Sequence, residues 1–328
     1  MSLLDSLTSG VSALLSFEKG LGVIGNNIAN ALTTGFKSST TTYSDNFSNL
    51  LQQSSPSPAD GQGSNTSASQ VGTGVQIAGV TGQFAQGTLS PTGNPANLGI
   101  SGDGFFVVRD PVNNVNYVTR AGDFRLDDQG YLVTSGGFRV QGLADGSASY
   151  DATVVDGVLT YTQTATPPTA LGDIKVDFNI SIGNGLTNDT GGVFTDAEVE
   201  AGKPTLQGFA VDPQGNLVLS LSNGDSFVRG KVLLQNFADP TALVREGNNL
   251  FSGLQAAGPE GGIALSGTNN SPGSNGLGRL QSGTIELSNV DLSDQFAQLI
   301  TTQRAFQAGA RIITVSDTIL EDVVNLKR

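Results

Sequence analysis

The sequence contains no cysteine, histidine or tryptophan among its 328 residues. The first two absences exclude disulfides, thiol nucleophiles, histidine-based acid–base catalysis and zinc sites built on cysteine or histidine. The lack of cysteine fits a reducing cytosol and also a bacterial exterior where assembly supplies stability, so the compartment stays open. Aromatic residues make up 6% of the chain, which argues against an aromatic sugar-binding platform.

Charge is also scarce and mostly negative. Charged residues are 14% of the chain, against a usual share of about 25%, and the net charge is −13. Nucleic-acid binding needs a basic surface, and no lysine or arginine lies between Lys37 and Arg109, so no nucleic-acid partner is predicted. No apolar run approaches the roughly 18 residues of a membrane span, and residues 1–10 lack the basic residues of a signal peptide. We therefore expect no direct membrane insertion and no cleavable signal.

The N-terminal segment has the pattern of a helix that packs against another helix. Residues 3–29 contain no proline, and their apolar residues follow a 3–4 spacing that Glu18 and Gly25 interrupt. Each glycine in the segment costs about 1 kcal/mol of helix propensity, so the helix alone is marginal in water. The predicted assembly residues of this seam are Leu4, Leu7, Val11, Leu14, Leu21 and Ile28.

The C-terminal segment repeats the pattern from residue 292 onward. Apolar residues step by four and three, with Gln303 and Asp317 as polar interruptions, over a helix of about 35 residues and roughly 50 Å. Ser288 or Asn289 is the predicted N-cap. The predicted assembly residues here are Leu292, Phe296, Leu299, Phe306, Ile313 and Leu320.

We predict an α+β fold in which the two terminal helices pair as a coiled-coil-like domain and a β-rich antiparallel meander is inserted between them. Glycine accounts for 44 residues, roughly twice the usual share of about 7%, which suits many tight turns. Asn223-Gly224 is a strong hairpin signal. The alternative is that each helix folds separately onto the β core. The predicted parts are a helical domain (1–32 and 286–328), a linker (33–74), a β-rich domain (75–146 and 204–285) and a small insertion or second subdomain (147–203).

The catalytic and metal motifs in the sequence are weak. Ser16 begins an S-x-x-K match and Ser44 an S-D-N match, but K-T-G is absent, and we expect Ser16 on an exposed helix face. Residues 123–130 lack the spacing and the final Glu of a calcium loop, so a turn is predicted there. We predict no catalytic residue, metal ligand or cofactor. The competing hypothesis is a β-rich binding or hydrolytic protein with helical ends.

Several motifs together resemble bacterial flagellar axial proteins of the rod and hook. Residues 25–30 (Gly-Asn-Asn-Ile-Ala-Asn) and 34–37 (Thr-Gly-Phe-Lys) are similar to the N-terminal signature of that family. Residues 288–292 and 303–307 are similar to its C-terminal signature, and residues 102–133 to its first β-domain. The resemblance adds further residues to the predicted assembly surface: Asn26, Asn27, Asn30, Phe36, Gln303 and Arg304.

The resemblance implies a structural subunit of the flagellar hook and basal body, outside the cell. It implies export of the unfolded chain through the flagellar type III apparatus and addition at the distal end beneath a cap. The implied partners are further copies of the chain and the rod, hook cap and hook–filament junction proteins. Within the family, residues 75–80 and 234–240 look more like the hook branch, a flexible joint that transmits torque. Residues 54–70 lie where the distal rod branch carries an extra segment, so that branch stays the alternative.

Overall fold

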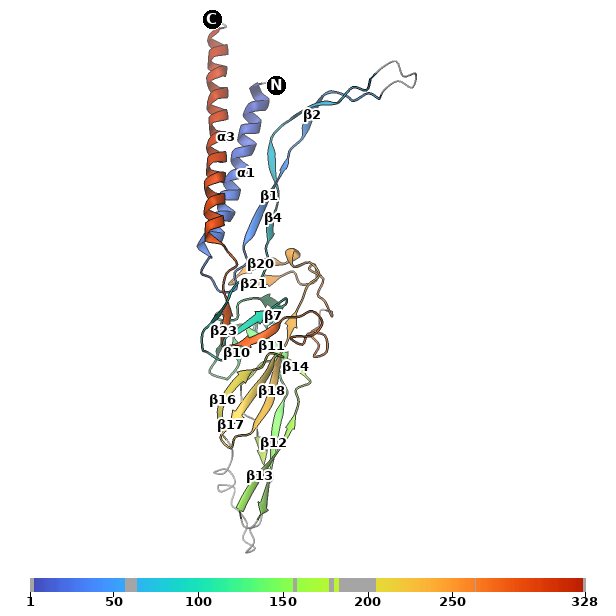
Figure 1. Cartoon of the computed structure of the whole chain (residues 1–328), viewed down its shortest axis with the longest axis vertical. Coiled ribbons are helices and arrows are strands. Elements are labelled where there is room, and N and C mark those ends of the chain that lie inside the picture. The colour runs from blue at the N-terminus through green and yellow to red at the C-terminus, as the bar shows by residue number, and fades with distance from the viewer. Residues whose placement is uncertain are drawn as a thin grey trace. The chain divides into compact units, whose positions relative to one another are not determined.

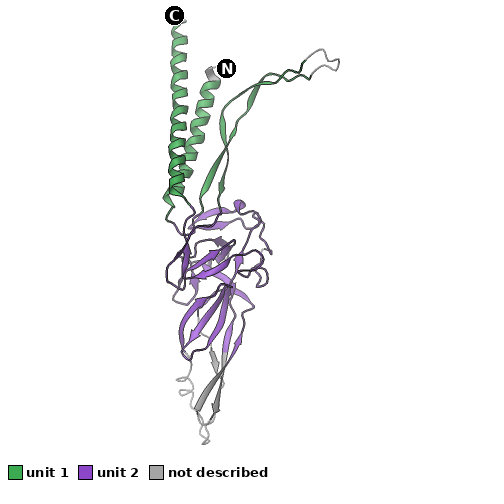
Figure 2. Ribbon diagram, in the orientation of Figure 1, with its two compact units in different colours: residues 1–32, 37–83, 290–328 green, residues 33–36, 84–289 purple. Residues whose placement is uncertain are grey.

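The computed structural model describes residues 3–56, 64–155, 158–176, 180–182, 205–262 and 264–326. The chain forms two compact units (Figure 2). Unit 1 comprises residues 1–32, 37–83 and 290–328, and unit 2 comprises residues 33–36 and 84–289. Unit 1 holds the paired terminal helices and unit 2 the β-rich middle, which confirms the predicted fold class. The division differs from the expected boundaries because residues 37–83 belong with the helices.

The two helices of unit 1 lie side by side (Figure 1). Helix α1 (Leu3–Ala29) has 27 residues and helix α3 (Leu292–Leu326) has 35, as the spacing of apolar residues predicts. Asp291 is the N-cap of α3, since its Oδ1 accepts hydrogen bonds from the backbone N–H of Ser293 at 2.8 Å and of Asp294 at 3.3 Å. The prediction of Ser288 or Asn289 as the cap is therefore wrong. Within the described residues, neither helix is long and apolar enough to cross a membrane.

An extended β ribbon completes unit 1 (Figure 1). Strand β1 (Ser39–Asp45) pairs antiparallel with β4 (Val75–Gly82), and β2 (Ser48–Gln52) pairs antiparallel with β3 (Ser69–Gly72). The threonines and the tyrosine of β1 favour strand. The ribbon thus occupies most of the segment that was expected to be a linker; residues 57–63 of that segment lie outside the described residues.

Unit 2 is built on an antiparallel sheet with the strand order β16-β17-β18-β11-β7-β8-β21-β20, beside which β9, β10, β14 and β19 pair. Strands β17 and β18 meet at the predicted hairpin turn, where Gly224 has φ of +88°. Three small sheets, β13-β12-β15, β6-β22 and β5-β23, complete the unit. The bounds are β5 (Leu89–Pro91), β6 (Leu98–Ser101), β7 (Phe105–Arg109), β8 (Asn116–Thr119), β9 (Arg125–Leu126), β10 (Leu132–Val133), β11 (Arg139–Leu143), β12 (Ser147–Val155), β13 (Val158–Thr166), β14 (Leu171–Asp173), β15 (Ile180–Ile182), β16 (Leu206–Val211), β17 (Asn216–Leu221), β18 (Ser226–Val232), β19 (Leu234–Gln235), the 3-10 turn η1 (Pro240–Ala242), β20 (Val244–Gly247), β21 (Leu250–Ser252), β22 (Arg279–Ser282) and β23 (Thr284–Glu286).

Strand β7 divides the hydrophobic core of unit 2 into two clusters. Successive side chains of a strand point to opposite faces, so Phe106 and Val108 pack into one cluster and Phe105 and Val107 into the other. Phe106 meets Phe124 edge to face, with ring centroids 5.0 Å apart. Both faces of this strand are therefore buried.

Two turns of unit 2 share one hydrogen-bond pattern. Asp127 Oδ1 accepts from the backbone N–H of Gln129 at 3.0 Å and of Tyr131 at 2.7 Å. Asp212 makes the same pair of bonds in its own turn. Gly215, with φ of +87°, occupies a left-handed position that glycine tolerates best. The segment that faintly resembles a calcium loop is a turn, as predicted.

Candidate assembly surface

Helices α1 and α3 run antiparallel and meet along a line of small and polar residues. On each helix these residues recur every seven positions, which keeps them on one face. The end layers are hydrogen-bonded, with the Oγ atoms of Ser6 and Ser316 3.2 Å apart and Asn27 Nδ2 3.0 Å from Gln295 Oε1. The layers are Ser6–Ser316, Ala13–Gly309, Gly20–Thr302 and Asn27–Gln295.

Glycine at the centre of this line brings the helices close together. A methyl group on Gly309 would lie 3.5 Å from Leu14 Cδ2 and 3.7 Å from Ala13 Cβ. A methyl group on Gly10 would lie 3.1 Å from Ile313 Cγ1. A larger side chain at Gly309 would overlap α1, because these contacts already leave no further room.

The predicted apolar seam agrees with this contact line only in part. Leu7, Leu14, Leu21, Ile28, Leu299, Phe306, Ile313 and Leu320 are half-buried. By contrast, Val11 is 39%, Leu292 43% and Phe296 50% exposed, and Gln303 and Arg304 are exposed as well. These five side chains are therefore not buried in the intramolecular seam. Leu4 falls within α1, and its side chain lies outside the described residues.

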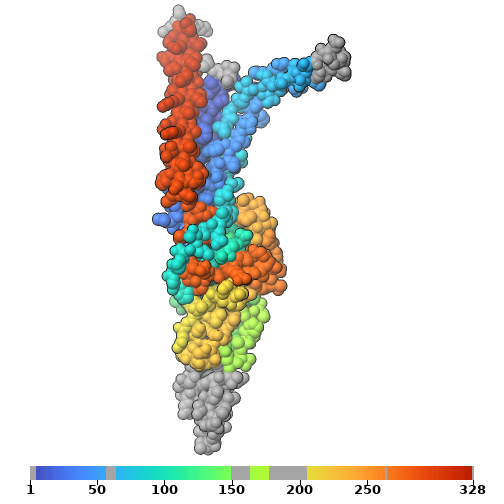
Figure 3. Space-filling model, viewed as in Figure 1, coloured from blue at the N-terminus to red at the C-terminus, as the bar shows by residue number. Residues whose placement is uncertain are grey.

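A second set of apolar side chains on α3 is left 42% or more exposed beside α1, and we call it the apolar outer stripe. Its exposed fractions run from 42% for Ile319 to 86% for Leu326. Figure 3 shows α3 uncovered along its length on the face in view. Its residues fall in two groups, 292–300 and 312–326, and exposed apolar groups of this kind mark an interaction surface. The stripe comprises Leu292, Phe296, Ile300, Ile312, Val315, Ile319, Val323, Val324 and Leu326.

Asn27 connects three elements of unit 1, namely α1, β1 and α3. Its side chain is 1% exposed. Its Nδ2 donates to the carbonyl of Ser39 at 2.7 Å and to Gln295 Oε1, while its Oδ1 accepts from the Ser39 N–H at 2.9 Å. Asn30 Nδ2 donates to the Asn26 carbonyl at 2.9 Å and closes the end of α1, and Asn26 itself is exposed. Of these three predicted assembly residues, Asn27 therefore holds the subunit together internally.

The ribbon is attached to α1 along its first pair of strands. Ser16 Oγ donates to the Val75 carbonyl at 3.2 Å, and Ser12 Oγ accepts from the Val75 N–H at 3.3 Å. Phe17 and Tyr43 pack edge to face at 5.6 Å, and partial burial raises the pKa of Tyr43. Ser16 is 6% exposed, so the expectation that it lies on an exposed helix face is wrong. Its hydroxyl attaches the ribbon to α1 through the hydrogen bond to Val75.

The Thr-Gly-Phe-Lys signature packs tightly at Gly35 and Phe36. Gly35 has φ of +67°, and a Cβ atom there would lie 2.5 Å from the backbone nitrogen of Ala121, so only glycine fits. Phe36 is 6% exposed, and the Arg245 guanidinium lies 5.0 Å from its ring centroid. Burial lowers the pKa of Arg245. The prediction that Phe36 faces other subunits is not supported by this burial.

Unit 2 contains a fully buried ion pair. Arg120 Nη1 lies 3.4 Å from Glu286 Oε2, and the two side chains are 3% and 1% exposed. Arg120 also donates to the Gly102 carbonyl at 3.0 Å, and Glu286 Oε1 accepts from the Gly87 N–H at 2.7 Å. Burial lowers the pKa of Arg120, and the charge of Glu286 opposes that shift. The pair crosslinks segments far apart in the sequence.

A second charged cluster in unit 2 centres on Asp173. Its carboxylate accepts from Arg109 Nη2 at 2.6 Å, Arg139 Nη1 at 3.1 Å and Gln141 Nε2 at 2.5 Å. Burial alone would raise the pKa of Asp173, but hydrogen bonds from Gln141 and the two arginines outweigh it, so the pKa is lowered. Across the described part of the chain, no group of three or more acidic residues is placed to hold a metal ion.

Family comparisons match the two ends and part of the middle of the chain. Residues 99–193 match the flagellar hook protein FlgE/F/G D1 domain. Residues 281–326 match the flagellar basal body rod FlgEFG protein C-terminal region, and residues 7–37 match the flagella basal body rod protein family.

Individual relatives align over almost the whole chain. Flagellar basal-body rod protein FlgG of Bacillus subtilis is 32% identical over 326 residues, covering 99% of this chain and 100% of the relative. Flagellar hook protein FlgE of Escherichia coli is 27% identical over 428 residues, covering 98% of this chain and 100% of the relative. A crystal structure of the Helicobacter pylori flagellar hook protein FlgE2 aligns with a TM-score of 0.36 at 8% identity, covering 60% of this chain and 100% of that one.

Proposed function

The chain belongs to the family of bacterial flagellar rod and hook proteins, and from this premise we propose that it is the subunit of the flagellar hook. It is a structural protein of the flagellum. As a hook subunit it polymerises into a tube that bends while it transmits torque to the filament. The terminal helices form the inner wall of that tube and unit 2 its outer layer.

The apolar outer stripe carries this proposal. Burying one large apolar side chain is worth about 1.5–3 kcal/mol. The stripe presents such side chains along α3, in a pair whose own contact line is mostly small or polar. Contact with neighbouring copies removes the stripe from water. A contact between unlike surfaces repeats without closing and builds a helical polymer.

The choice of hook within the family is supported by residues 75–80 and 234–240, which look more like the hook branch. In the same role the chain passes unfolded through the flagellar type III apparatus and contacts rod, hook cap and hook–filament junction proteins. It performs no catalysis and needs no cofactor in this role, in keeping with a sequence without histidine or cysteine.

The distal rod is the second candidate, and a specific observation favours it. The Bacillus subtilis rod protein aligns at 32% identity over 326 residues, close to the length of this chain. Hook proteins of Escherichia coli and Treponema pallidum align at 27% and 28% over 428 and 474 residues, which requires long gaps.

Electron microscopy of concentrated protein tests both candidates. A hook subunit forms curved tubes, and a distal rod subunit forms straight ones. Val315→Asp places a charge in the apolar outer stripe and is expected to abolish tubes while leaving the denaturant midpoint of unit 2 unchanged. Val112→Asp, at an 84% exposed position in unit 2, is the matched control. Normal tubes from Val315→Asp would contradict the role of the stripe, and failure of the unmodified chain to form tubes would contradict both candidates.

A further inference from the structure

Phe47 is an exposed aromatic side chain on a backbone that is held in place. Its ring is 84% exposed. Its carbonyl accepts from the N–H of Thr73 at 2.9 Å and from the Thr73 hydroxyl at 2.6 Å, and its N–H donates to Asn46 Oδ1 at 2.9 Å. Leu50 and Leu51, just beyond it on β2, are 53% and 69% exposed. A fixed aromatic group loses little conformational entropy on binding, so Phe47 is preorganised as an anchor.

The stretch of chain that begins just before Phe47 carries no charge. Residues 46–59 contain no lysine, arginine, aspartate or glutamate, although Asp45 precedes them at the end of β1. Three exposed apolar side chains on this uncharged stretch form what we call the ribbon patch (Phe47, Leu50 and Leu51). A patch of this kind is suited to a partner surface that is also apolar and uncharged.

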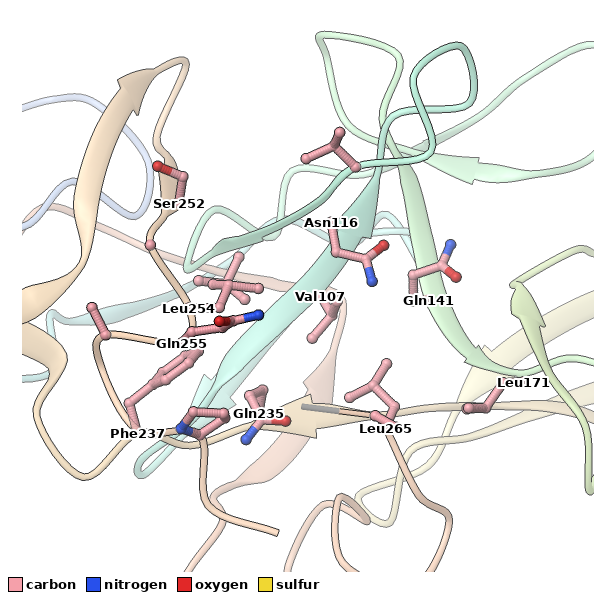
Figure 4. Close-up of a pocket in the computed structure, with 16 residues that line it drawn as sticks. Val107, Asn116, Gln141, Leu171, Gln235, Phe237, Ser252, Leu254, Gln255 and Leu265 are labelled. Carbon is pink, nitrogen blue, oxygen red and sulfur yellow. The ribbon is translucent and has the colours of Figure 1, made fainter. Parts of the chain in front are cut away.

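Unit 2 contains an apolar cavity with that character. It has a volume of about 640 Å³ and lies between β7, β8, β11, β19 and residues 252–259, 264 and 265. Figure 4 shows the lining side chains, among them Val107, Phe237, Leu254 and Leu265. None of its lining residues is charged. A volume of this size is typical of a ligand site and holds more than one side chain.

Gln141 and Gln235, two of the polar residues in the cavity wall, already have partners within the chain. Gln141 Nε2 donates to Asp173 Oδ1 at 2.5 Å. Gln235 Nε2 donates to the Glu260 carbonyl at 2.8 Å, and Gln235 Oε1 accepts from Asn270 Nδ2 at 3.0 Å. These two amides are not available to a polar occupant, which would lose part of its hydration on entering the cavity, whereas an apolar occupant incurs no such loss.

We propose that this cavity receives the ribbon patch of a second copy of the chain, with Phe47 as the anchor. The proposal rests on the proposed polymerisation, and it assigns a contact that the apolar outer stripe does not make. Each copy carries a net charge of −13, so most contacts between copies bring like charges together. The ribbon patch and the cavity are both uncharged and can meet without that repulsion.

Cysteine crosslinking in assembled tubes tests the contact directly, because the chain has no cysteine of its own. Ser48→Cys places a thiol beside Phe47, and Gln255→Cys places one among the cavity-lining residues. In tubes of the double variant, a short bis-maleimide is expected to give a ladder of covalent multimers. Ser48→Cys with Gln129→Cys, an exposed turn position away from the lining, is the matched control and is expected to give none.

Truncation of the anchor gives a second measurement. Phe47→Ser is expected to raise the protein concentration needed for tubes by about tenfold or more, whereas Phe47→Leu retains most of the assembly. Tubes of Phe47→Ser at the unmodified concentration, or tubes without the Ser48–Gln255 crosslink, would overturn the contact while the proposed function stands. A crosslink within dilute monomer would assign the ribbon patch to its own cavity and also overturn it. If the unmodified chain forms no tubes, the proposed function fails and this contact fails with it.

Discussion

Single buried polar side chains connect distant parts of the sequence in both units. Asn27 connects α1 with β1 and α3, and Glu286 connects β23 with Arg120 and with the backbone of Gly87. Water cannot replace a lost partner of either side chain, because both are only 1% exposed. Removing one partner of such a contact leaves the other desolvated and unpaired, which costs more than the contact itself contributes.

Arg120→Met is expected to destabilise unit 2 strongly. The substitution leaves the carboxylate of Glu286 buried without its counter-charge, and loss of one partner from a buried ion pair costs about 3–5 kcal/mol. Urea unfolding followed by circular dichroism measures the loss. The double variant Arg120→Met/Glu286→Leu should recover part of it, because no buried charge then remains. A loss below about 1 kcal/mol for the single variant would match an exposed pair and contradict this account.

Asp173→Asn is expected to have an effect that depends on pH. The folded chain lowers the pKa of Asp173 below its unfolded value of about 3.9. The carboxylate therefore stabilises the fold above that pH, and its contribution is lost as the pH falls through the folded pKa. At pH 7 the variant should lose about 1.5–3 kcal/mol, as for hydrogen bonds to a charged group. The difference in unfolding free energy between the variant and the unmodified chain should become smaller below about pH 4.

Unfolding curves at several pH values check this prediction. Asp128→Asn removes an equal charge from an exposed turn and is the control. A difference between Asp173→Asn and the unmodified chain that stays constant down to the lowest pH would show that the arginines act on the site by packing alone.

At the scale of elements, both helices could be predicted from the sequence, but their contact line could not. Absence of proline and the 3–4 apolar spacing indicate where the helices run. The contact line uses Gly309, Ser316 and Thr302, and small or polar residues give no hydrophobic signal. Helix α3 carries two sets of apolar residues, the predicted seam and the apolar outer stripe. The composition of the helix alone does not indicate which set contacts α1. The heptad recurrence of glycine, serine and threonine was the available signal.

The β ribbon could not be predicted from the sequence for a different reason. Its partner strands β1 and β4 are separated by a low-complexity segment rich in serine, proline and glutamine. The local composition of that segment indicates a loop, whereas the paired residues of β1 and β4 are 30 (Asp45 and Val75) to 43 (Ser39 and Gly82) positions apart in the sequence. Strand pairing over that separation leaves no local pattern. Gly35, in contrast, was recognised by its signature, and its positive φ gives the physical reason.

Two substitutions at Gly309 test the contact line. Gly309→Ala should keep or improve tube formation, because a methyl group fits at 3.5 Å and alanine gains about 1 kcal/mol of helix propensity over glycine. Gly309→Leu should abolish tubes, because its extra carbons overlap Ala13 and Leu14. Sedimentation of polymer measures both, with unit 2 unfolding as the control for general damage. Equal sedimentation of the two variants would show that α1 and α3 do not meet at this residue in the tube.

At the scale of the whole molecule, we expect the order of the helices to depend on assembly. Of the large apolar side chains described in α1 and α3, Ile24 is the one that is buried. The pair therefore gains little hydrophobic free energy within one subunit, and isolated helices are marginal without packing. The neighbours in the polymer supply the burial that the single chain lacks, as in coupled folding and binding.

Hydrogen exchange should detect this dependence. In dilute monomer, residues 1–30 and 290–328 should exchange rapidly, while β7 and β11 in unit 2 stay protected. In tubes, both terminal segments should become protected. Limited proteolysis of the monomer should trim the terminal helices and stop near the ends of unit 2, at about residues 33 and 289. Strong protection of both helices in the monomer would instead indicate that the antiparallel pair is stable before assembly.

The glycine and serine layers between α1 and α3 also affect how wide the central channel of a tube of these subunits can be. Helices that meet through small residues lie near the lower end of the usual interaxial range of about 8–10 Å. Where two such helices stand one behind the other across the wall of a tube, that spacing sets the wall thickness. A thinner wall leaves a wider bore for the same outer diameter. The small residues in these layers would therefore leave a wider passage for any unfolded chain that travels through the tube.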